Sequence, residues 1–346
     1  MILSEQFKRK DKTFIIAELS ANHGRDIEVA KRTIYAACNA GADAIKIQTY
    51  TADTLTIDSD RKYFKIDSGT IWDGRTLYDL YKEAYLPWEW HKELKECAEE
   101  LGLIFFSTPF DITAVDFLED LGVPIYKVAS FEIMDIPLIE YIASKDKPVI
   151  ISTGVAELSD IEEAIKAMKK MGNENVVLLK TTSSYPAKTE DANLETMRNM
   201  KDTFGVEVGV SDHTQDFIVP IVSVALGGTV IEKHFILDRS IGGPDATFSL
   251  LPEEFKQMVN SVRGTEKALG RVDYSIDEKK KNNRKLSRSL FFVQDMKKGD
   301  VITEENMRSI RPGDGLLPKY LPDIIGKKVR ENIKRGTPAN WNYIEL

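Results

Sequence analysis

The chain has 346 residues, of which 42% are hydrophobic and 29% charged, as in an ordinary globular protein with length for two domains. Its formal net charge of −8 argues against non-specific nucleic-acid binding, which needs a basic surface. No apolar run approaches the roughly 18 residues of a membrane span, and the first residues have no secretory pattern. We therefore expect no membrane span and a cytoplasmic location, with Cys38 and Cys97 as small buried hydrophobes in a reducing compartment.

Short apolar runs alternate with segments of helical periodicity over most of the chain. The runs that predict strands are residues 13–19, 43–50, 103–109, 124–130, 148–154, 175–182, 206–210 and 228–233. A helical pattern follows each run; after the first, Ile27, Ala30, Ile34 and Ala37 recur at helical intervals. Repeated β–α units imply a parallel sheet, and eight of them close into a (β/α)₈ TIM barrel. A doubly wound open sheet is the alternative.

Two stretches depart from this rhythm. Residues 51–85 follow the second predicted strand and are rich in aromatic residues, which suggests a long loop over the top of the barrel. After Gly270 the chain becomes polar and mostly basic, and then shows short strand-like pieces separated by turns at "KKGD", "RPGDG" and "KRGT". The sequence therefore predicts a barrel over residues 1–270, a linker over 271–285 and a small β-rich domain over 286–346.

Polar residues stand at every predicted strand end. Because the active site of a (β/α)₈ barrel lies at the C-terminal ends of its strands, these residues should converge. In chain order they are Glu18, Lys46, Gln48, Ser107, Thr108, Lys127, Ser130, Glu132, Ser152, Thr153, Ser183, Tyr185, Ser211, Asp212, His213, Lys233 and His234.

Two of the four histidines, His213 and His234, follow strands that would be neighbours in the barrel. Two imidazoles there could share an exchangeable divalent cation such as Mn²⁺, Mg²⁺ or Co²⁺ and leave positions open for water and substrate. Hydrogen-bonding histidines without a metal are the alternative. Lys46 and Lys127, beside serines and threonines on other strand ends, favour an anion-binding site; surface salt bridges are the alternative reading.

Eight motifs, in order along the chain, resemble the sialic acid synthase family. They are "AELSANHGRD", "KIQTY", "STPFD", "KVASFEI", "ISTG", "SDHT", "EKHF" and "GGPDATFSL". The C-terminal "SRSLFF" and "KKGDVIT" resemble that family's antifreeze-like (SAF) domain. The resemblance covers nearly the whole chain. It implies condensation of phosphoenolpyruvate with an open-chain N-acetylated amino sugar, with release of phosphate by C–O cleavage, and a divalent metal, Mn²⁺ first, on His213 and His234.

That reaction suggests a role for each candidate residue. Glu132 would deprotonate the attacking water, and Glu18, Lys46 and Lys127 complete the predicted catalytic set. The predicted phosphoenolpyruvate contacts are Lys46, Thr108, Lys127, Ser130, Ser152, Ser183 and Ser211. The predicted sugar contacts are Glu18, Tyr185, Asp245 and Arg288. By resemblance, Arg288 reaches the barrel of a partner subunit, so that the SAF domain completes the neighbour's site in a homodimer; ordinary linker charge is the alternative for Arg288.

Two features resemble the pseudaminic acid synthase branch of the family. "ELSANH" stands where neuraminate synthases usually read "EIG.NH", and residues 69–91 form an added aromatic segment. That branch uses 2,4-diacetamido-2,4,6-trideoxy-altrose, and Trp72, Tyr78 and Tyr81 could supply an apolar surface for it; loop packing is the alternative. The sequence leaves open neuraminate or legionaminate synthesis, a Schiff-base pyruvate lyase using Lys46 or Lys127, and a non-catalytic carbohydrate-binding protein.

Overall fold

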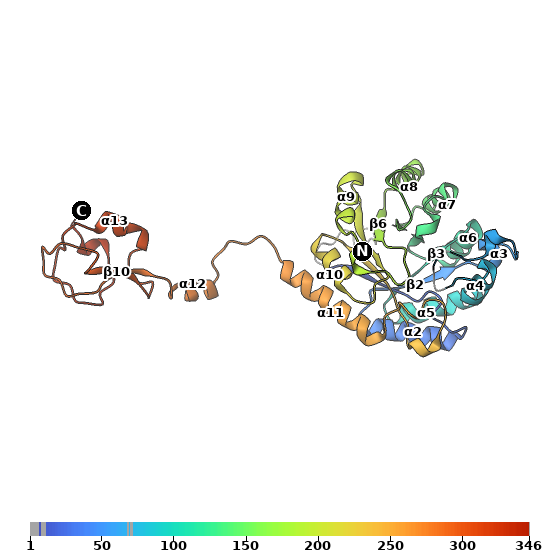
Figure 1. The fold of residues 1–346 in the computed structure, drawn as a ribbon, viewed down its shortest axis with the longest axis horizontal. Coiled ribbons are helices and arrows are strands. Elements are labelled where there is room, and N and C mark those ends of the chain that lie inside the picture. The colour runs from blue at the N-terminus through green and yellow to red at the C-terminus, as the bar shows by residue number, and fades with distance from the viewer. Residues whose placement is uncertain (1–6, 8–11, 68, 70–71, 346) are drawn as a thin grey trace. The chain divides into compact units, whose positions relative to one another are not determined.

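The computed structural model describes residues 7, 12–67, 69 and 72–345, and the chain divides into two compact units, Met1–Gly270 and Arg271–Leu346. The first unit is a closed barrel of eight parallel strands, in which β1 pairs with both β2 and β8. Figure 1 shows this unit with its helices around the strands. Closure confirms the predicted TIM barrel. It also excludes the open sheet, which would leave its outermost strands unpaired on one side.

The eight strands are short and almost entirely buried, and each overlaps a predicted apolar run. They are β1 (Phe14–Glu18), β2 (Ala44–Thr49), β3 (Ile104–Pro109), β4 (Tyr126–Val128), β5 (Val149–Ser152), β6 (Val176–Thr181), β7 (Glu207–Asp212) and β8 (Val230–His234).

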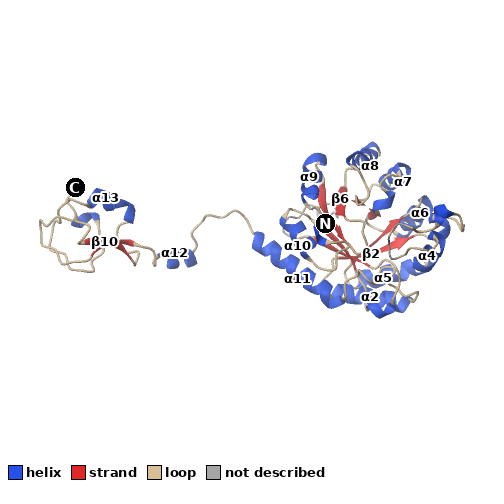
Figure 2. Ribbon diagram, in the orientation of Figure 1, coloured by secondary structure: helices blue, strands red, loops and turns tan. Residues whose placement is uncertain are grey.

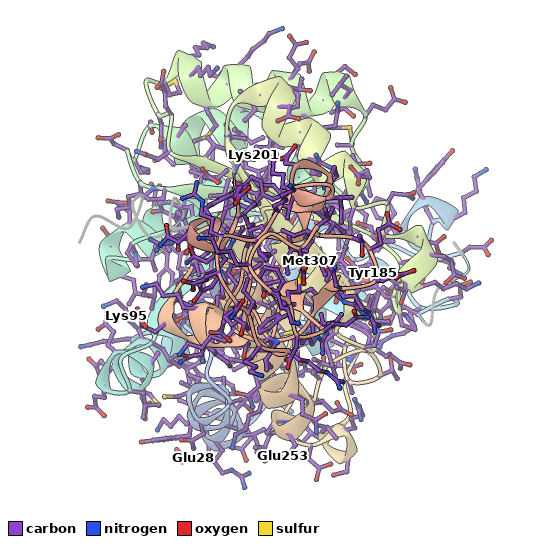
Figure 3. The ribbon with its side chains drawn as sticks, turned by 90° about the vertical axis from the view of Figure 1, so that its left-hand side faces the viewer. Glu28, Lys95, Tyr185, Lys201, Glu253 and Met307 are labelled. Carbon is purple, nitrogen blue, oxygen red and sulfur yellow. The ribbon has the colours of Figure 1, made fainter. Side chains whose placement is uncertain are left out.

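Helices surround the strands, as Figure 2 shows by colour. They are α2 (Ile27–Asn39), α5 (His91–Glu100), α6 (Ile112–Leu121), α7 (Ile136–Ala143), α8 (Leu158–Lys170), α9 (Glu195–Phe204), α10 (Ile218–Ala225) and α11 (Pro252–Leu269). Local sequence sets their ends: α6 begins after Asp111, whose carboxylate accepts from two backbone amides, and stops at Gly122, which has φ of 75°. Charged residues such as Glu28, Lys95, Lys201 and Glu253 lie on these outer helices (Figure 3).

Side-chain alternation along the strands places the site above an apolar plug. Successive strand residues face opposite sides of the sheet. Inside the barrel, the lower positions are apolar and pack together, among them Phe14, Ile16, Phe106, Ile150 and Leu179. Nearer the C-terminal end of the strands, the same side carries polar residues instead, such as Glu18 two residues after Ile16 and Ser152 two residues after Ile150. The inner face of the barrel is therefore a closed core at its N-terminal end and a polar pocket at its C-terminal end.

The segment 51–85 is more structured than the predicted loop. It contains α3 (Ala52–Leu55), a 3₁₀ turn at Lys62–Phe64 and α4 (Leu77–Ala84). Thr76 caps α4 by accepting from the backbone N–H of Asp79. Three residues of this segment, Ser68, Thr70 and Ile71, lie outside the described residues.

The second unit has its own small core around a two-stranded antiparallel sheet. The strands β9 (Ser289–Phe292) and β10 (Met307–Ile310) pair over an apolar cluster that includes Leu290, Phe292 and Met307. Isolated bridges and the short α13 (Leu321–Ile324) complete it. The predicted linker contains α12 (Glu278–Arg284). In neither unit does a described helix combine the length and apolarity needed to cross a membrane.

Candidate active site

A pocket opens at the C-terminal ends of the barrel strands and collects most of the predicted site residues. It is lined by Glu18, Lys46, Gln48, Thr108, Lys127, Ala129, Ser130, Ser152, Thr181, Tyr185, Ser211, His213, Glu232 and His234. All eight strands or the residues directly after them contribute. Of the residues given a role from the sequence, Glu132, Ser183, Asp245 and Arg288 are not part of this lining. The same holds for four of the other predicted strand-end residues, Ser107, Thr153, Asp212 and Lys233.

Lys46 forms the charged centre of one side of the pocket. Its Nζ lies 2.8 Å from Glu18 Oε2 and 3.7 Å from Glu232 Oε1, and it donates to Thr108 Oγ1 at 3.2 Å. Burial alone would lower the pKa of Lys46, but the attraction of the two carboxylates raises it overall. Burial also raises the pKa of Glu18 to about 7, against the opposing effect of Lys46. Lys46 therefore keeps its charge deep inside the barrel.

Lys127 is equally buried, but its hydrogen-bond partners are neutral. Its Nζ donates to the Val128 carbonyl at 2.8 Å and to Ser152 Oγ at 2.6 Å. Burial lowers its pKa to about 8, and distant carboxylates offset only part of this effect. A buried ammonium without a directly bound carboxylate is well suited to hold an anionic ligand.

Backbone and hydroxyl groups approach each other closely around Ser130, a residue of the pocket lining. The backbone N–H of Gly154 donates to Ser130 Oγ at 3.1 Å. A Cβ added to Gly154 would stand 2.1 Å from Ser183 Oγ and 2.9 Å from Ser130 Oγ. Only a glycine leaves this space, so Ser183 borders the pocket at this point although it is not part of the lining.

His213 and His234 stand next to each other, with ring centroids 5.2 Å apart. His213 Nδ1 lies 3.0 Å from the Thr182 carbonyl oxygen. Because a carbonyl can only accept, the ring proton sits on Nδ1 and Nε2 keeps a free lone pair. His234 Nδ1 is buried and has no hydrogen-bond partner among the described residues. Burial lowers the pKa of His213, and that of His234 well below its usual value, so both rings are neutral.

These residues fit a divalent cation. Neutral imidazoles are the form that binds metals, and His234 carries an unpartnered ring nitrogen. Four carboxylates, those of Glu18, Glu132, Glu232 and Asp245, lie in or beside the pocket. Burial raises the pKa of Glu18, Glu132 and Asp245, and a cation bound nearby would favour their ionised forms. No group of three or more His, Cys, Asp and Glu side chains in the described part of the chain is arranged to hold a metal. The pocket could therefore offer two imidazoles and leave the other positions open.

Glu132 and Asp245 lie just outside the lining. Glu132 ends a 3₁₀ turn at Ser130–Glu132, and its Oε2 is buried without a hydrogen-bond partner among the described residues. Burial raises its pKa to about 7, with Lys127 opposing. Asp245 Oδ2 accepts from Ser20 Oγ at 2.5 Å and lies 3.8 Å from His234 Nδ1. Arg288 belongs to the second unit, where its Nη1 donates to the Ser309 carbonyl at 3.0 Å.

An aromatic group borders the pocket on the side of the histidines. The Tyr185 ring packs against His213, with centroids 4.5 Å apart, and against Trp72 at 5.7 Å. Trp72 also donates from Nε1 to the Pro244 carbonyl at 3.3 Å. Of the three loop aromatics named from the sequence, Trp72 therefore packs on a pocket-lining residue, Tyr185, without being part of the lining itself. Tyr81 packs on Tyr50 instead, and Tyr78 donates to Asp53.

Sequence reasoning missed Glu232 and Thr181. Glu232 lies two residues before His234, so both side chains face into the barrel, and Glu232 Oε1 accepts from Ser211 Oγ at 3.0 Å. Lys233 and Asp212, which were in the group of polar strand ends, are not in the lining; Lys233 Nζ pairs with Asp212 Oδ2 at 2.6 Å. Strand alternation identifies Glu232 from the sequence, because the residue two positions before His234 faces the same side of the strand.

Comparison with known proteins agrees with this architecture. The NeuB family matches residues 33–274, and the SAF domain matches residues 287–345. A pseudaminic acid synthase of Campylobacter jejuni is 47% identical over 330 residues, which cover 95% of this chain and 96% of that protein. An N,N'-diacetyllegionaminic acid synthase of Legionella pneumophila is 40% identical, covering 96% and 94%. The crystal structure of N-acetylneuraminic acid synthetase from Leptospira borgpetersenii, in complex with citrate, superposes with a TM-score of 0.70 at 33% identity, covering 79% and 90%. The chain belongs to the NeuB family.

Proposed function

We propose that this chain is a pseudaminic acid synthase, which condenses phosphoenolpyruvate with 2,4-diacetamido-2,4,6-trideoxy-altrose and water to give pseudaminic acid and phosphate. The observation that carries the reaction class is the pocket itself, which two buried lysines and two neutral histidines at the strand ends line together. The choice of sugar is supported by the 47% identity to the Campylobacter jejuni pseudaminic acid synthase. Trp72 and Tyr185 offer an apolar surface to a sugar that has lost its C6 hydroxyl.

Phosphoenolpyruvate is the anion that the lysines would hold. Lys127, whose direct partners are neutral, has the stronger need for a negative ligand. Lys46 adds a second positive charge on the adjacent side. The hydroxyl groups that could donate to the carboxylate and phosphate oxygens are those of Thr108, Ser130, Ser152, Ser183 and Ser211.

The C2–C3 π electrons of phosphoenolpyruvate form a bond from C3 to the aldehyde carbon of the open-chain sugar. The C=O π pair of the aldehyde moves to its oxygen, which becomes a hydroxyl by taking up one proton, and the water that adds in the next step replaces that proton. Positive charge then develops at C2 of the former phosphoenolpyruvate. Glu132 takes a proton from a water molecule that adds to C2, and collapse of the resulting tetrahedral centre breaks the C2–O bond and releases phosphate. A carboxylate with a pKa near 7 is well matched to this task, because a large share of it is ionised at neutral pH while it remains a useful base.

The other groups hold and orient the sugar. Glu18 and Tyr185 in the pocket lining, and Asp245 beside His234, would contact its hydroxyl and acetamide groups. His213 and His234 would hold a divalent metal, Mn²⁺ in preference to Mg²⁺ or Co²⁺, which when bound supplies a Lewis acid for the sugar aldehyde. The two imidazoles remain neutral for this purpose because burial lowers the pKa of each.

We also propose that the active form is a homodimer in which the C-terminal unit of one subunit completes the site of the other, with Arg288 reaching the sugar. Exposed apolar side chains around the strand ends support this, among them Phe131, which is 63% exposed, and Met134. In the linker, Val272 and Tyr274 are exposed as well. A closed two-fold arrangement would cover these side chains in both subunits. A cytoplasmic location stays a prediction.

A phosphate-release assay tests the proposal. The enzyme is given phosphoenolpyruvate with 2,4-diacetamido-2,4,6-trideoxy-altrose, N-acetylmannosamine or no sugar, with and without EDTA. We expect release that requires the altrose derivative and is abolished by EDTA. Faster release with N-acetylmannosamine would assign neuraminate synthesis instead. Covalent trapping of pyruvate by borohydride on Lys46 or Lys127 would establish the lyase alternative, and no release with any sugar would favour a binding protein.

A further inference from the structure

Ser20 adopts a backbone conformation that serine rarely takes. It follows β1 in a turn closed by a hydrogen bond from the backbone N–H of Asn22 to the Leu19 carbonyl, at 3.0 Å. Its φ is 47°, in the left-handed region that glycine adopts freely and other residues do not. Ser20 is also only 4% exposed, so water does not stabilise its hydroxyl. Such strain persists where the side chain makes contacts that glycine could not make.

The Ser20 hydroxyl joins two of the predicted sugar contacts. It donates to Asp245 Oδ2 at 2.5 Å and accepts from Gln48 Nε2 at 3.0 Å. The same Gln48 amide nitrogen donates to Glu18 Oε1 at 3.1 Å. The Ser20 hydroxyl thus bonds directly to the Asp245 carboxylate on the loop after β8. Through Gln48 on β2, it is also connected to the Glu18 carboxylate on β1.

The same turn also holds the backbone of Asp245. Asn22 Nδ2 donates to Ser249 Oγ at 2.7 Å, and Ser249 Oγ donates to the Asp245 carbonyl at 2.6 Å. Asp245 is therefore held from both sides, at its carbonyl by Ser249 and at its carboxylate by Ser20. The carboxylate consequently stands 3.8 Å from His234 Nδ1, at the rim of the pocket.

We propose that Ser20 is a positioning residue that aims the Asp245 carboxylate, and through Gln48 the Glu18 carboxylate, at the sugar in the pocket. The inference rests on the proposed function, in which those two carboxylates contact the sugar. Ser20 does not touch the reacting atoms. Its hydroxyl sets the direction of two groups that do, and the strained backbone is retained because only a side chain at this position reaches both partners.

Two substitutions separate the hydroxyl from the strain. Ser20→Gly removes both, and Ser20→Ala removes the hydroxyl while leaving a side chain in the left-handed conformation. We expect both variants to lose roughly 10- to 100-fold in kcat/KM for the sugar, the range seen when a supporting hydrogen bond is removed at a reactive site. We expect the KM for phosphoenolpyruvate to stay within about twofold, since the lysines that bind it keep their contacts. Ser20→Gly should melt at or above the wild-type temperature, and Ser20→Ala below it.

A purely structural role gives a different pattern. In that case the loss of activity would follow the melting temperature, so Ser20→Gly would keep wild-type sugar kinetics, and that result would overturn the proposal. Combining each variant with Asp245→Asn provides a second measure. We expect the combined loss to be smaller than the product of the single losses, because both changes disable the same contact. Fully multiplicative losses would also overturn the proposal.

Failure of the proposed function would look different from failure of this inference. If the wild-type protein releases no phosphate with any sugar, the proposed function falls. The positioning role is then decided by the crystal structure of Ser20→Ala. The inference expects the Asp245 carboxylate to leave its place 3.8 Å from His234 Nδ1. An unmoved carboxylate in that variant would overturn it.

Discussion

The two ends of the barrel differ in how their charged side chains are paired. At the N-terminal end, a hollow is bordered by Lys12, Thr13 and Asp43, and the partly exposed charges in and beside it are paired. Lys12 Nζ lies 2.6 Å from Asp43 Oδ1, and Arg263 lies 2.8 Å from both Asp43 and Glu266. Glu266 also accepts from the backbone N–H of Thr13. Each charge there has a direct partner of opposite sign.

At the C-terminal end, several buried polar atoms have no partner among the described residues. They include Glu132 Oε2, Glu232 Oε2 and His234 Nδ1. Lys127 has only neutral hydrogen-bond partners. Leaving such groups unpaired costs stability, and native proteins do so mainly where a ligand will supply the missing partner. The comparison predicts that substitutions at the C-terminal end change chemistry, whereas those at the N-terminal end change stability.

Glu132→Gln should have the largest effect on turnover. Loss of a general base costs roughly 100- to 10,000-fold in rate. Burial raises the pKa of Glu132 from 4.5 to about 7, so the folded protein binds this proton more tightly than the unfolded chain does. The wild type therefore loses stability as pH rises between these two values, and the glutamine variant, which cannot ionise, should be the more stable above about pH 7.

Rates and melting temperatures on both sides of pH 7 check this prediction. The expected signature is an inactive variant with a raised melting temperature at alkaline pH. A variant that is inactive because it is less stable at every pH would contradict the catalytic role.

His213→Ala and His234→Ala should each weaken Mn²⁺ binding by more than about 100-fold, the upper range for residues that merely support a metal ligand. The matched control is His91→Gln. His91 is also buried, but its Nε2 lies 2.8 Å from Thr49 Oγ1 and its Nδ1 3.2 Å from the Pro87 carbonyl, outside the pocket. Titration of free Mn²⁺ by electron paramagnetic resonance measures the affinity. Equal weakening by the His91 substitution would show that the effect is not specific to the pocket.

Lys127→Met should raise the KM for phosphoenolpyruvate by about one to two decades, since a hydrogen bond to a charged group contributes roughly 1.5–3 kcal/mol. Because burial lowers its pKa to about 8, the wild-type lysine loses its charge above that pH, and the KM should rise there. This alkaline rise should be absent in the variant.

At the other end of the barrel, Arg263→Met should leave the KM for phosphoenolpyruvate unchanged and cost roughly 1–3 kcal/mol of unfolding free energy. A raised KM in Arg263→Met, together with an unchanged KM and a loss of stability in Lys127→Met, would contradict the comparison between the two ends.

Gly154→Ala should have a smaller effect, about tenfold on the KM for phosphoenolpyruvate, because the new methyl group overlaps the hydroxyls that would bind the anion. Gly264→Ala in α11 is the control, because nothing lies within 4 Å of its added Cβ. That change should add about 0.5–1 kcal/mol of stability and leave kinetics unaltered. Steady-state assays and chemical denaturation compare the pair; unchanged kinetics in Gly154→Ala would place the anion elsewhere.

The sequence predicted the barrel because apolar runs and helical periodicities alternate at regular intervals. The ends of α6 and α11 coincide with local signals, since Asp111 and Gly122 flank α6 and Pro252 is the first residue of α11. The site was predicted where a residue stands at a strand end, as for Lys46 and His234. The segment 51–85 was less well predicted, because the short helices α3 and α4 carry too few turns for a periodicity to stand out.

The remaining site features depend on direction and on distant contacts. Glu232 and Lys233 are adjacent in sequence, and only the register of β8 decides which of them faces the pocket. Ser20 meets Asp245 across 225 residues of chain, and its positive φ follows from that contact rather than from any local pattern. Neither the direction of the Glu232 side chain nor the contact between Ser20 and Asp245 can be predicted from composition or periodicity.

Oxygen-18 water tests the central claim most directly, namely that the strand-end pocket directs water to C2 of phosphoenolpyruvate. The enzyme turns over phosphoenolpyruvate and 2,4-diacetamido-2,4,6-trideoxy-altrose in labelled water, and mass spectrometry reads the phosphate. Attack at carbon breaks the C–O bond, so we predict phosphate without the label. Phosphate that carries one labelled oxygen would mean attack at phosphorus, and would contradict the account.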